Sequence, residues 1–232
     1  MLFIAASKAG QRLPQHQRAI EAAKKAGVSH IVYTSFIGVD VPDHPALVVQ
    51  EHKATEAMIR GSGLRWTMLR DAQYAEAISD VAAPTALKCG KLQSNSGDGR
   101  MAFISRNDCV ASAIAVLTNP AVHRDKVYHI TGPELLNWTD VAHIISSVTG
   151  RDIKYEEQSD EEQFAIFDRM GIPRVATDDS IVAGHPWHST DMVSFARAMR
   201  LGHMAFISND VMKLTGQKPR SLREVVEERL RL

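Results

Sequence analysis

The chain opens with MLFIAASKAG QRLPQHQRAI EAAKKAGVSH IVYTS (residues 1–35), which predicts a strand, a loop, a helix and a second strand. Leu2–Ala5 is a short continuous apolar run, as expected for a strand buried on both faces of a parallel sheet. The helix is predicted over Pro14–Ala26, because proline suits its first turn and Gly27 suits its end. The next apolar run predicts a strand over Ser29–Thr34. This order is typical of a parallel α/β domain.

The same alternation continues beyond residue 35. An amphipathic helix is predicted over Gln50–Ser62 and a third strand over Arg65–Leu69. These elements are typical of the second half of a dinucleotide-binding domain, because no glycine-rich phosphate loop precedes the first strand. We therefore expect an α/β fold with a Rossmann-like parallel sheet that lacks its first strands and its glycine-rich loop. A small C-terminal lobe is expected on the substrate side.

The composition excludes several classes of protein. Of the 232 residues, 44% are hydrophobic and 23% are charged, as in ordinary globular domains. Lys+Arg and Asp+Glu both number 27, and this balance argues against nucleic acid or an anionic membrane as a partner. No apolar run approaches the roughly 20 residues that span a bilayer. The two cysteines, Cys89 and Cys109, are too few for a disulfide framework, so we expect a soluble protein in the reducing cytoplasm.

We expect a single domain over residues 1–232. Residues 1–76 would form the second half of the Rossmann core, and residues 77–232 would combine further core elements with the lobe.

Gly97-Asp98-Gly99 predicts a turn rather than a phosphate loop, because an apolar segment and not a helix follows it. Ser105 and Asp108 have the spacing of a capping box and predict the start of a helix.

Two histidines and an aspartate, His185, His188 and Asp191, have the residue types of a metal site. Pro186 lies between the histidines and breaks the helical spacing that would bring both rings to one face. We therefore expect no metal.

The catalytic dyad of the short-chain dehydrogenases is missing. Those enzymes use Tyr-x-x-x-Lys, in which the lysine lowers the pKa of the tyrosine so that it can act as a general acid. Four residues after Tyr33, Tyr74, Tyr128 and Tyr155 stand Ile37, Ile78, Gly132 and Ser159. None of the four tyrosines is therefore followed by the required lysine.

A histidine at the start of the second helix is a candidate acid or base. His52 and Glu56 are four residues apart, so they lie on one helix face and are close enough for a hydrogen bond. The pair could act on a bound substrate, or it could simply hold the start of the helix. The sequence leaves both readings open.

Short segments spread along the chain carry a family resemblance. In the first third they are Gly10-Gln11-Arg12, Pro14-Gln15-His16, Ala22-Ala23-Lys24-x-Ala26-Gly27-Val28 and Tyr33-Thr34-Ser35. Further on they are His52-x-x-Thr55-Glu56, Ser62-Gly63-Leu64-x-x-Thr67-x-Leu69-Arg70, Gly97-Asp98-Gly99, Ser208-Asn209-Asp210 and Leu214-Thr215-Gly216. Their order and spacing resemble the NmrA-like group of atypical short-chain dehydrogenases/reductases. Within this group they are most similar to the bacterial NAD(P)H:quinone oxidoreductase and triphenylmethane reductase branch.

The resemblance implies a Rossmann-like fold that binds NADP or NAD over the carboxyl edge of the sheet. The loop after the first strand would line the dinucleotide, Thr34 and Ser35 would lie beside the nicotinamide ribose, and Arg106 would lie near the substrate. The implied cofactor-binding residues are Ala5, Ala6, Ser7, Thr34, Ser35, Asp71, Ala72, Gln73, Tyr74, Ala75 and Glu76. Family members often have serine where Ala5 and Ala6 stand, and asparagine where Asp71 stands.

The resemblance also implies NAD(P)H-dependent reduction of quinone-like or other conjugated acceptors by hydride transfer. Tyr74 and His52 would be the catalytic residues, Tyr74 by packing beside the nicotinamide and His52 by helping to supply a proton. The missing dyad is compatible with this reaction, because a hydroquinone anion is only modestly basic and solvent can protonate it. In the alternative reading, Tyr74 is a core aromatic residue.

Two other functions stay open. The chain could be a non-catalytic NAD(P)-binding redox sensor of the NmrA type, or a remnant that binds nothing.

Family members carry further strands before the one that begins this chain, so we expect an N-terminally truncated member, either a fragment or a natural short form. The expected partner is a small-molecule acceptor, and a homodimer stays open.

Overall fold

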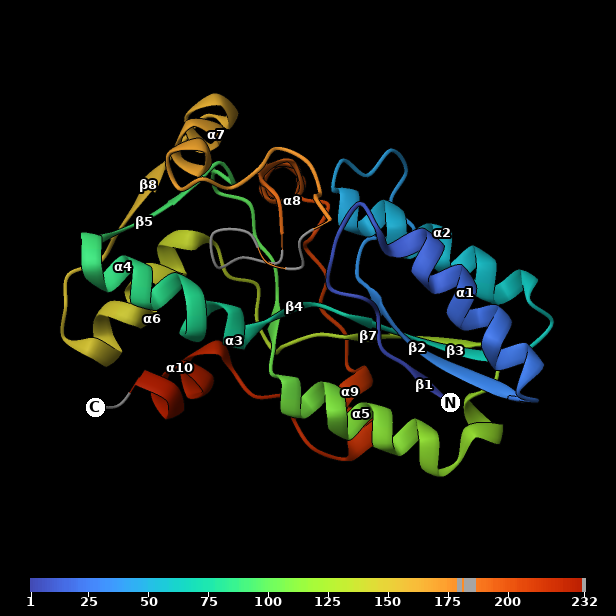
Figure 1. Cartoon of the computed structure of the whole chain (residues 1–232). Helices are drawn as coiled ribbons and strands as arrows, with labels where there is room; N and C mark the ends of the chain where they lie inside the picture. Colours follow the sequence, from blue (N-terminus) through green and yellow to red (C-terminus); the bar gives the residue numbers. More distant parts are fainter. Residues whose placement is uncertain (179–180, 182–186, 231–232) are drawn as a thin grey trace.

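A four-stranded parallel sheet with the order β1-β2-β3-β7 forms the centre of the computed structural model, which describes residues 1–178, 181 and 187–230 (Figure 1). Its strands are β1 (Leu2–Phe3), β2 (His30–Phe36), β3 (Arg65–Asp71) and β7 (Lys126–Ile130). The predicted α/β fold with a parallel sheet is thus confirmed. The first strand is shorter than predicted, and the second continues two residues beyond Thr34.

The register brings the carboxyl ends of the strands to one edge. Phe36 lies opposite Asp71, and Asp71 lies opposite Ile130. In open parallel sheets this edge is where ligands bind. The end of β3 is therefore at the centre of the edge that the sequence predicts for the cofactor.

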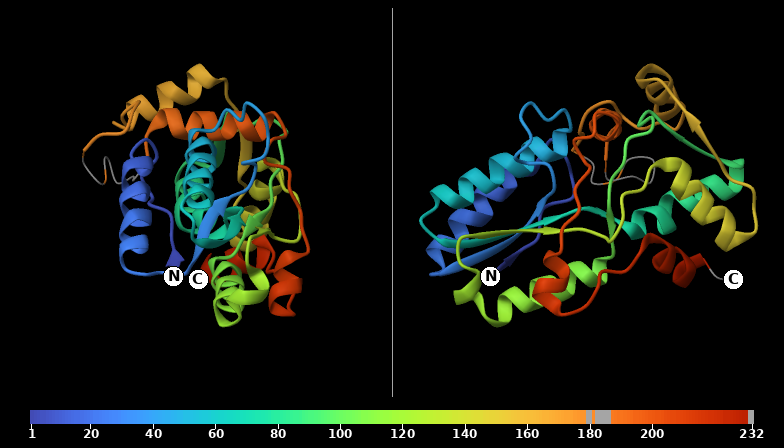
Figure 2. Two further views of the ribbon diagram at one scale, coloured as in Figure 1. Left: turned by 90° about the vertical axis from the view of Figure 1, so that its right-hand side faces the viewer. Right: turned by 180° about the vertical axis from the view of Figure 1, so that it is seen from behind.

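Helices cover both faces of the sheet (Figures 1 and 2). On one face lie α1 (Arg12–Lys25) and α2 (Leu47–Gly61), and on the other lie α5 (Arg106–Thr118) and α9 (Asp210–Thr215). On the first face, Ile20 of α1 packs with Phe3 and Tyr33 of the strands in a buried apolar cluster. Burying this face stabilises the α1–sheet contact by roughly 25 cal/mol for each Å² of apolar surface removed from water.

A lobe lies beyond the carboxyl edge of the sheet (Figure 1). It contains two parallel pairs of short strands, β4 with β6 and β5 with β8. The strands are β4 (Gln73–Tyr74), β5 (Lys91–Ser94), β6 (Phe103–Ile104) and β8 (Lys154–Glu157). The helices not yet named are α3 (Ala75–Ala77), η1 (Ile78–Ala82), α4 (Ala83–Cys89), η2 (Pro120–His123), α6 (Trp138–Thr149), α7 (Asp160–Arg169), α8 (Ser189–Arg200) and α10 (Leu222–Leu230).

The sheet and the lobe share one apolar core. Leu69 and Ile130 of the sheet belong to the same buried cluster as Phe103 and Ile145 of the lobe. No helix in the described residues is long and apolar enough to cross a membrane.

The turn at Gly97–Gly99 is confirmed, and it packs against the end of α8. Gly97 has a φ of +52°, a conformation that favours glycine. A Cβ atom at Gly99 would lie 2.1 Å from the carbonyl oxygen of Met199. The glycines therefore allow a close backbone contact within the lobe. The predicted cap at Ser105 is also present, since its side chain accepts the N–H of Asp108 at the start of α5.

Candidate functional site at the carboxyl edge of the sheet

The loop between β1 and α1, which the sequence predicts to line the dinucleotide, is held from within. The N–H of Ala5 donates to Oγ1 of Thr34 over 2.9 Å, and the N–H of Ala6 donates to Nε2 of His16 over 3.0 Å. Both backbone donors are therefore engaged with the protein. Ser7 is exposed, so its side chain is open to a ligand.

A buried arginine fastens the same loop. The guanidinium of Arg12 donates to the carbonyl oxygens of Ala6 and Ser7 and lies 3.3 Å from the carboxylate of Glu51. Glu51 in turn accepts the N–H of Gly10 over 2.9 Å. Arg12 and Glu51 are both buried, so this ion pair is shielded from solvent. The shape of the loop is thus determined before any ligand binds.

The two predicted residues at the end of β2 face opposite sides of the sheet. Thr34 is half-buried, and its Oγ1 accepts the N–H of Ala5, which leaves its hydroxyl hydrogen available as a donor. Ser35 is buried and donates to Oε1 of Glu56 over 2.6 Å. Of the two hydroxyls, Thr34 is therefore the better placed for a ribose.

The segment from Asp71 to Glu76 contains both buried and half-buried residues. Ala72 and Ala75 belong to the apolar core. Both oxygens of Glu76 accept the N–H of Arg106, at 3.0 and 3.1 Å, which holds the start of α5. Gln73 and Tyr74 are half-buried and are the positions of this segment open to a ligand.

Tyr74 lies against two other predicted site residues, Asp71 and Arg106. The guanidinium of Arg106 lies 5.3 Å from the centroid of its ring, within the range of a cation–π contact. Its hydroxyl faces the carboxyl group of Asp71. Cys109, at the start of α5, also faces this carboxyl group. The structure therefore brings Asp71, Tyr74 and Arg106 together.

His52 is buried and does not pair with Glu56. It shares a hydrogen bond of 2.8 Å with the hydroxyl of Tyr33, and its ring lies 5.9 Å from that of Phe36. Burial keeps the pKa of His52 well below its ordinary value, and the nearby Arg12 adds to the effect. A histidine in this state is neutral at pH 7, so it can offer a hydrogen bond but holds no ready proton for transfer.

Glu56 belongs instead to a buried ion pair. Its oxygens accept from Nε and Nη2 of Arg70, both over 2.9 Å, in a bidentate arrangement. Arg60 and Ser35 also donate to this carboxylate, and Arg70 also pairs with Asp40. The expected contact with His52 is therefore replaced by a network that joins α2 to the ends of β2 and β3.

The histidine–aspartate pair of the sequence analysis has a helix-capping arrangement. His188 precedes α8, and its side chain accepts the N–H of Asp191 over 3.3 Å. His185 and Pro186 lie outside the described residues. Among the described residues, no group of three or more His, Cys, Asp or Glu side chains could hold a metal ion.

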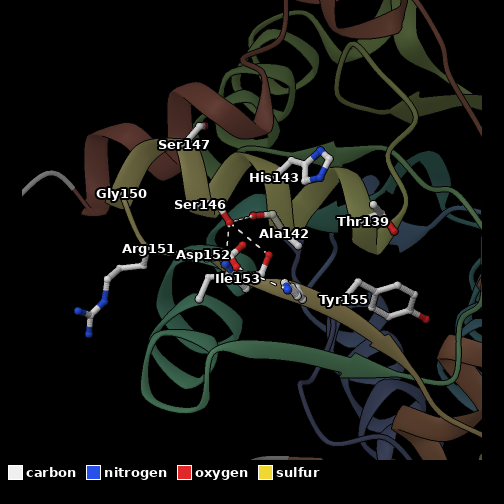
Figure 3. Close-up of a pocket in the computed structure, with 11 residues that line it drawn as sticks. Thr139, Ala142, His143, Ser146, Ser147, Gly150, Arg151, Asp152, Ile153 and Tyr155 are labelled. Carbon is white, nitrogen blue, oxygen red and sulfur yellow. Dashed lines mark hydrogen bonds and ion pairs between the residues drawn. The ribbon is translucent and has the colours of Figure 1, made fainter.

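The large open pocket of about 740 Å³ between α6 and β8 is a different feature (Figure 3). It lies in the lobe and not at the carboxyl edge of the sheet. Arg151 and Tyr155 point away from each other toward opposite ends of it. These two side chains therefore do not converge on one point, as the polar groups of a specific ligand site do.

Four residues that hold or face the site were not predicted as site residues from the sequence. Arg12 and His16 lie within the quoted segments but carried no assigned role, and Glu51 and Cys109 were not assigned to the site either. The spacing of Gly10-Gln11-Arg12 and His16 was the available signal for the first two. Glu51 directly precedes His52, and this neighbourhood was its available signal, whereas no sequence pattern brings Cys109 of α5 to this edge.

Comparison with known proteins agrees with this geometry. The model of a family described as NAD(P)H-binding matches residues 1–120. Quinone oxidoreductase 2 of Escherichia coli is 36% identical over 173 residues, which cover 75% of this chain and 59% of that protein. The chain thus spans about three fifths of the length of this curated relative.

Two solved structures have the same fold. The NADPH-dependent quinone oxidoreductase of Escherichia coli, complexed with NADPH, matches with a TM-score of 0.84 at 31% identity, covering 98% of this chain and 75% of that chain. The triphenylmethane reductase of Citrobacter sp., complexed with NADP(H), matches with a TM-score of 0.82 at 27% identity, covering 99% and 76%. The family match covers more than half of this chain, and the segments quoted above already resembled this group. The chain belongs to the NAD(P)H-binding, NmrA-like family.

Proposed function

We propose that this chain binds NADPH or NADH at the carboxyl edge of the sheet and reduces quinone-like or other conjugated acceptors by hydride transfer. The observation that carries the proposal is the half-buried Tyr74 in β4, just beyond the end of β3, with Arg106 against its ring. Membership of the NAD(P)H-binding family and the quinone oxidoreductase among its relatives support the same assignment.

The residues at this edge fit the nicotinamide half of the cofactor. Ala5 and Ala6 have small side chains, so a ribose can approach the loop closely. The hydroxyl of Thr34 retains a hydrogen that can be donated to a ribose oxygen. The cofactor, when bound, supplies the hydride.

The protein's contribution to the reaction is then mainly orientation. Tyr74 offers a flat apolar surface on which a conjugated acceptor can stack, with Arg106 beside it to favour developing negative charge. The buried Arg12 holds the loop rigidly, so binding does not have to order it. His52 contributes a neutral ring beneath the site rather than a transferable proton.

One set of contacts favours the second candidate, a non-catalytic redox sensor. The N–H groups of Ala5 and Ala6 and the hydroxyl of Ser35 are all engaged inside the protein. These groups are therefore not available to the cofactor. Weak and reversible binding of the cofactor, as in a redox sensor, is consistent with this arrangement. For either function we place the protein in the cytoplasm, with a small molecule as its partner.

Turnover separates the two functions. The purified chain is titrated with NADPH and NADH by calorimetry, and oxidation of each is then followed with a panel of benzoquinones and naphthoquinones. Binding with acceptor-dependent turnover supports the reductase. Binding without turnover of any acceptor supports the sensor, and absence of binding contradicts both.

A further inference from the structure

A buried carboxyl group without a counter-ion lies at the centre of the proposed site. Asp71 ends β3 and is only 3% exposed. Its Oδ1 has no well-formed hydrogen bond to any described residue, and no ion pair to it is found in the same part of the chain. A carboxylate in this position would be charged, dry and unpaired, which is costly.

The groups that face Asp71 offset only part of this cost. From β4 and α5 it meets the hydroxyl of Tyr74 and the thiol of Cys109, which are both neutral. From β2 and β7 its register partners are Phe36 and Ile130. The carboxylates of Glu76 and Asp108 lie behind Cys109 and add negative charge.

The positive charge beside Tyr74 is already engaged elsewhere. Arg106 lies over the ring of Tyr74, and its Nη1 is 3.6 Å from Asp80. Burial raises the pKa of Asp71 to about 8, although the Cys109 thiol and the Tyr74 hydroxyl lower it slightly. The site therefore holds a protonated carboxylic acid at neutral pH, next to the hydroxyl of the half-buried Tyr74.

We propose that Asp71 is the proton reserve of the site and that it acts through the hydroxyl of Tyr74. This inference rests on the proposed reductase function. After hydride transfer the acceptor carries a negative oxygen. That oxygen takes the proton of the Tyr74 hydroxyl while Tyr74 takes the proton of Asp71, so no free phenolate forms. A proton from solvent then returns to the Asp71 carboxylate through the Tyr74 hydroxyl, so each turnover takes up one proton from solvent.

The geometry favours Asp71 over His52 for this task. His52 is neutral and engaged with Tyr33, whereas Asp71 holds its proton near the pH at which the reaction would run. Asp71 does not touch the acceptor in this scheme and is a positioning residue for the proton on Tyr74. The hydroxyl of Tyr74 is the group that contacts the acceptor.

The first test is the pH dependence of turnover in Asp71→Asn, which keeps the shape of the side chain but removes its proton. For the natural chain, kcat with a quinone should fall as the pH rises through about 8. Asp71→Asn should lower kcat about 10-fold or more at pH 7, and its kcat should no longer decrease as the pH rises through about 8. Tyr74→Phe should show the same loss, and the double variant should lose no more than either single variant. An Asp71→Asn enzyme with the rate and pH profile of the natural chain overturns the proposal.

The second test needs no activity. Asp71 has a folded pKa of about 8 against an ordinary value of 3.8, so its protonation stabilises the fold, and this stability is lost as the pH rises from about 4 to about 8. Asp71→Asn should therefore gain in melting temperature over the natural chain as the pH rises across this range. An unchanged difference across this range contradicts a protonated Asp71.

A matched variant separates the two roles of burial and proton supply. Asp191 is also buried with a raised pKa, but it lies in the first turn of α8, near the charges of Arg12 and His188. Asp191→Asn should change how the melting temperature depends on pH and leave the pH profile of kcat in place. If the natural chain turns over no acceptor at any pH, the proposed function fails, and with it the proton transfer. The melting difference of Asp71→Asn would still appear in that case.

Discussion

The backbone N–H of Ala6 donates to Nε2 of His16 over 3.0 Å, and this contact places the proton of the neutral imidazole on Nδ1. Nδ1 lies 2.9 Å from Oγ1 of Thr55, which donates in turn to the carbonyl oxygen of Glu51. Both ring nitrogens of His16 are thus used to hold the β1–α1 loop against α2. A protonated ring could no longer accept from Ala6.

This contact predicts acid sensitivity. Burial, with a smaller effect of Arg12, lowers the pKa of His16 to about 4. The stability due to neutral His16 is fully present above about pH 6.5 and is lost as the pH falls toward 4. His16→Gln, measured by urea unfolding, should show a smaller loss over this range than the natural chain.

His44 provides the control for His16. Burial also lowers its pKa to about 4, but it lies in the loop before α2. His44→Gln should reduce the acid sensitivity similarly without changing NADPH affinity, whereas His16→Gln should weaken that affinity. Equal NADPH affinity in both variants would contradict the role of His16 in shaping the loop.

Tyr33 and Tyr128 both share a hydrogen bond with a histidine, at 2.8 and 2.7 Å, but only Tyr33 is fully buried. Tyr33→Phe should lower the free energy of unfolding by about 1–3 kcal/mol, because it leaves Nδ1 of His52 buried without its partner. Tyr128→Phe, in which water can replace the lost contact, should cost less than about 1 kcal/mol. Urea unfolding of both variants measures the difference, and equal losses would show that burial does not decide it.

Tyr74 and His52 should differ in their effect on catalysis. Tyr74→Ala removes the surface that orients the acceptor and should lower the rate of quinone reduction by roughly 10–100-fold. His52→Ala should cost at most about 10-fold, since His52 supplies no proton. Steady-state kinetics of both variants provide the test. A larger loss for His52 would reverse the assignment, and no loss for either would move the site elsewhere.

Glu56 and Asp40 bind the same arginine from different environments. Glu56→Gln breaks the buried bidentate pair with Arg70 and should destabilise the fold by about 3 kcal/mol. Asp40 is 77% exposed, so Asp40→Asn should cost less than about 1 kcal/mol. Thermal and urea unfolding of both variants give the comparison. A comparable loss for Asp40→Asn would mean that the surface half of the network carries the stability.

Gly99 and Gly61 provide a test of the turn in the lobe. Gly99→Ala would push a Cβ against the Met199 carbonyl and should cost about 2 kcal/mol or more. Gly61, at the end of α2, has no atom within 4 Å of the added Cβ, so Gly61→Ala should be neutral or stabilising. Melting temperatures of the two variants are compared. A stable Gly99→Ala would show that the turn can move away from α8.

The local sequence was sufficient to predict the first three strands of the sheet and the helices between them. Apolar runs predicted the parallel strands, because a strand covered by helices on both faces needs apolar residues at successive positions. Ser105 and Gly97 predicted a helix start and a turn, because caps and positive φ angles depend on one or two residues. Element ends were less exact: α1 begins at Arg12 rather than Pro14, since proline is tolerated throughout the first turn, where N–H groups have no partner within the helix.

The candidate site was only partly predictable, because its chemistry depends on residues far apart in the chain. The family resemblance implied that Asp71 and Tyr74 lie beside the cofactor and Arg106 near the substrate. It also allowed a contact between His52 and Glu56 from their spacing on one helix. Only the tertiary structure paired His52 with Tyr33 and Glu56 with Arg70, since partners on neighbouring strands compete with those on the same helix.

The clearest difference concerns charge. From the sequence alone Asp71 is an ordinary acidic residue, ionised at neutral pH. Its burial beside Cys109, with Arg106 held by Asp80, removes both water and a counter-ion from the carboxyl group. The sequence by itself determined which residue ends β3, and only the packing of the lobe and α5 around it decided that this residue keeps its proton.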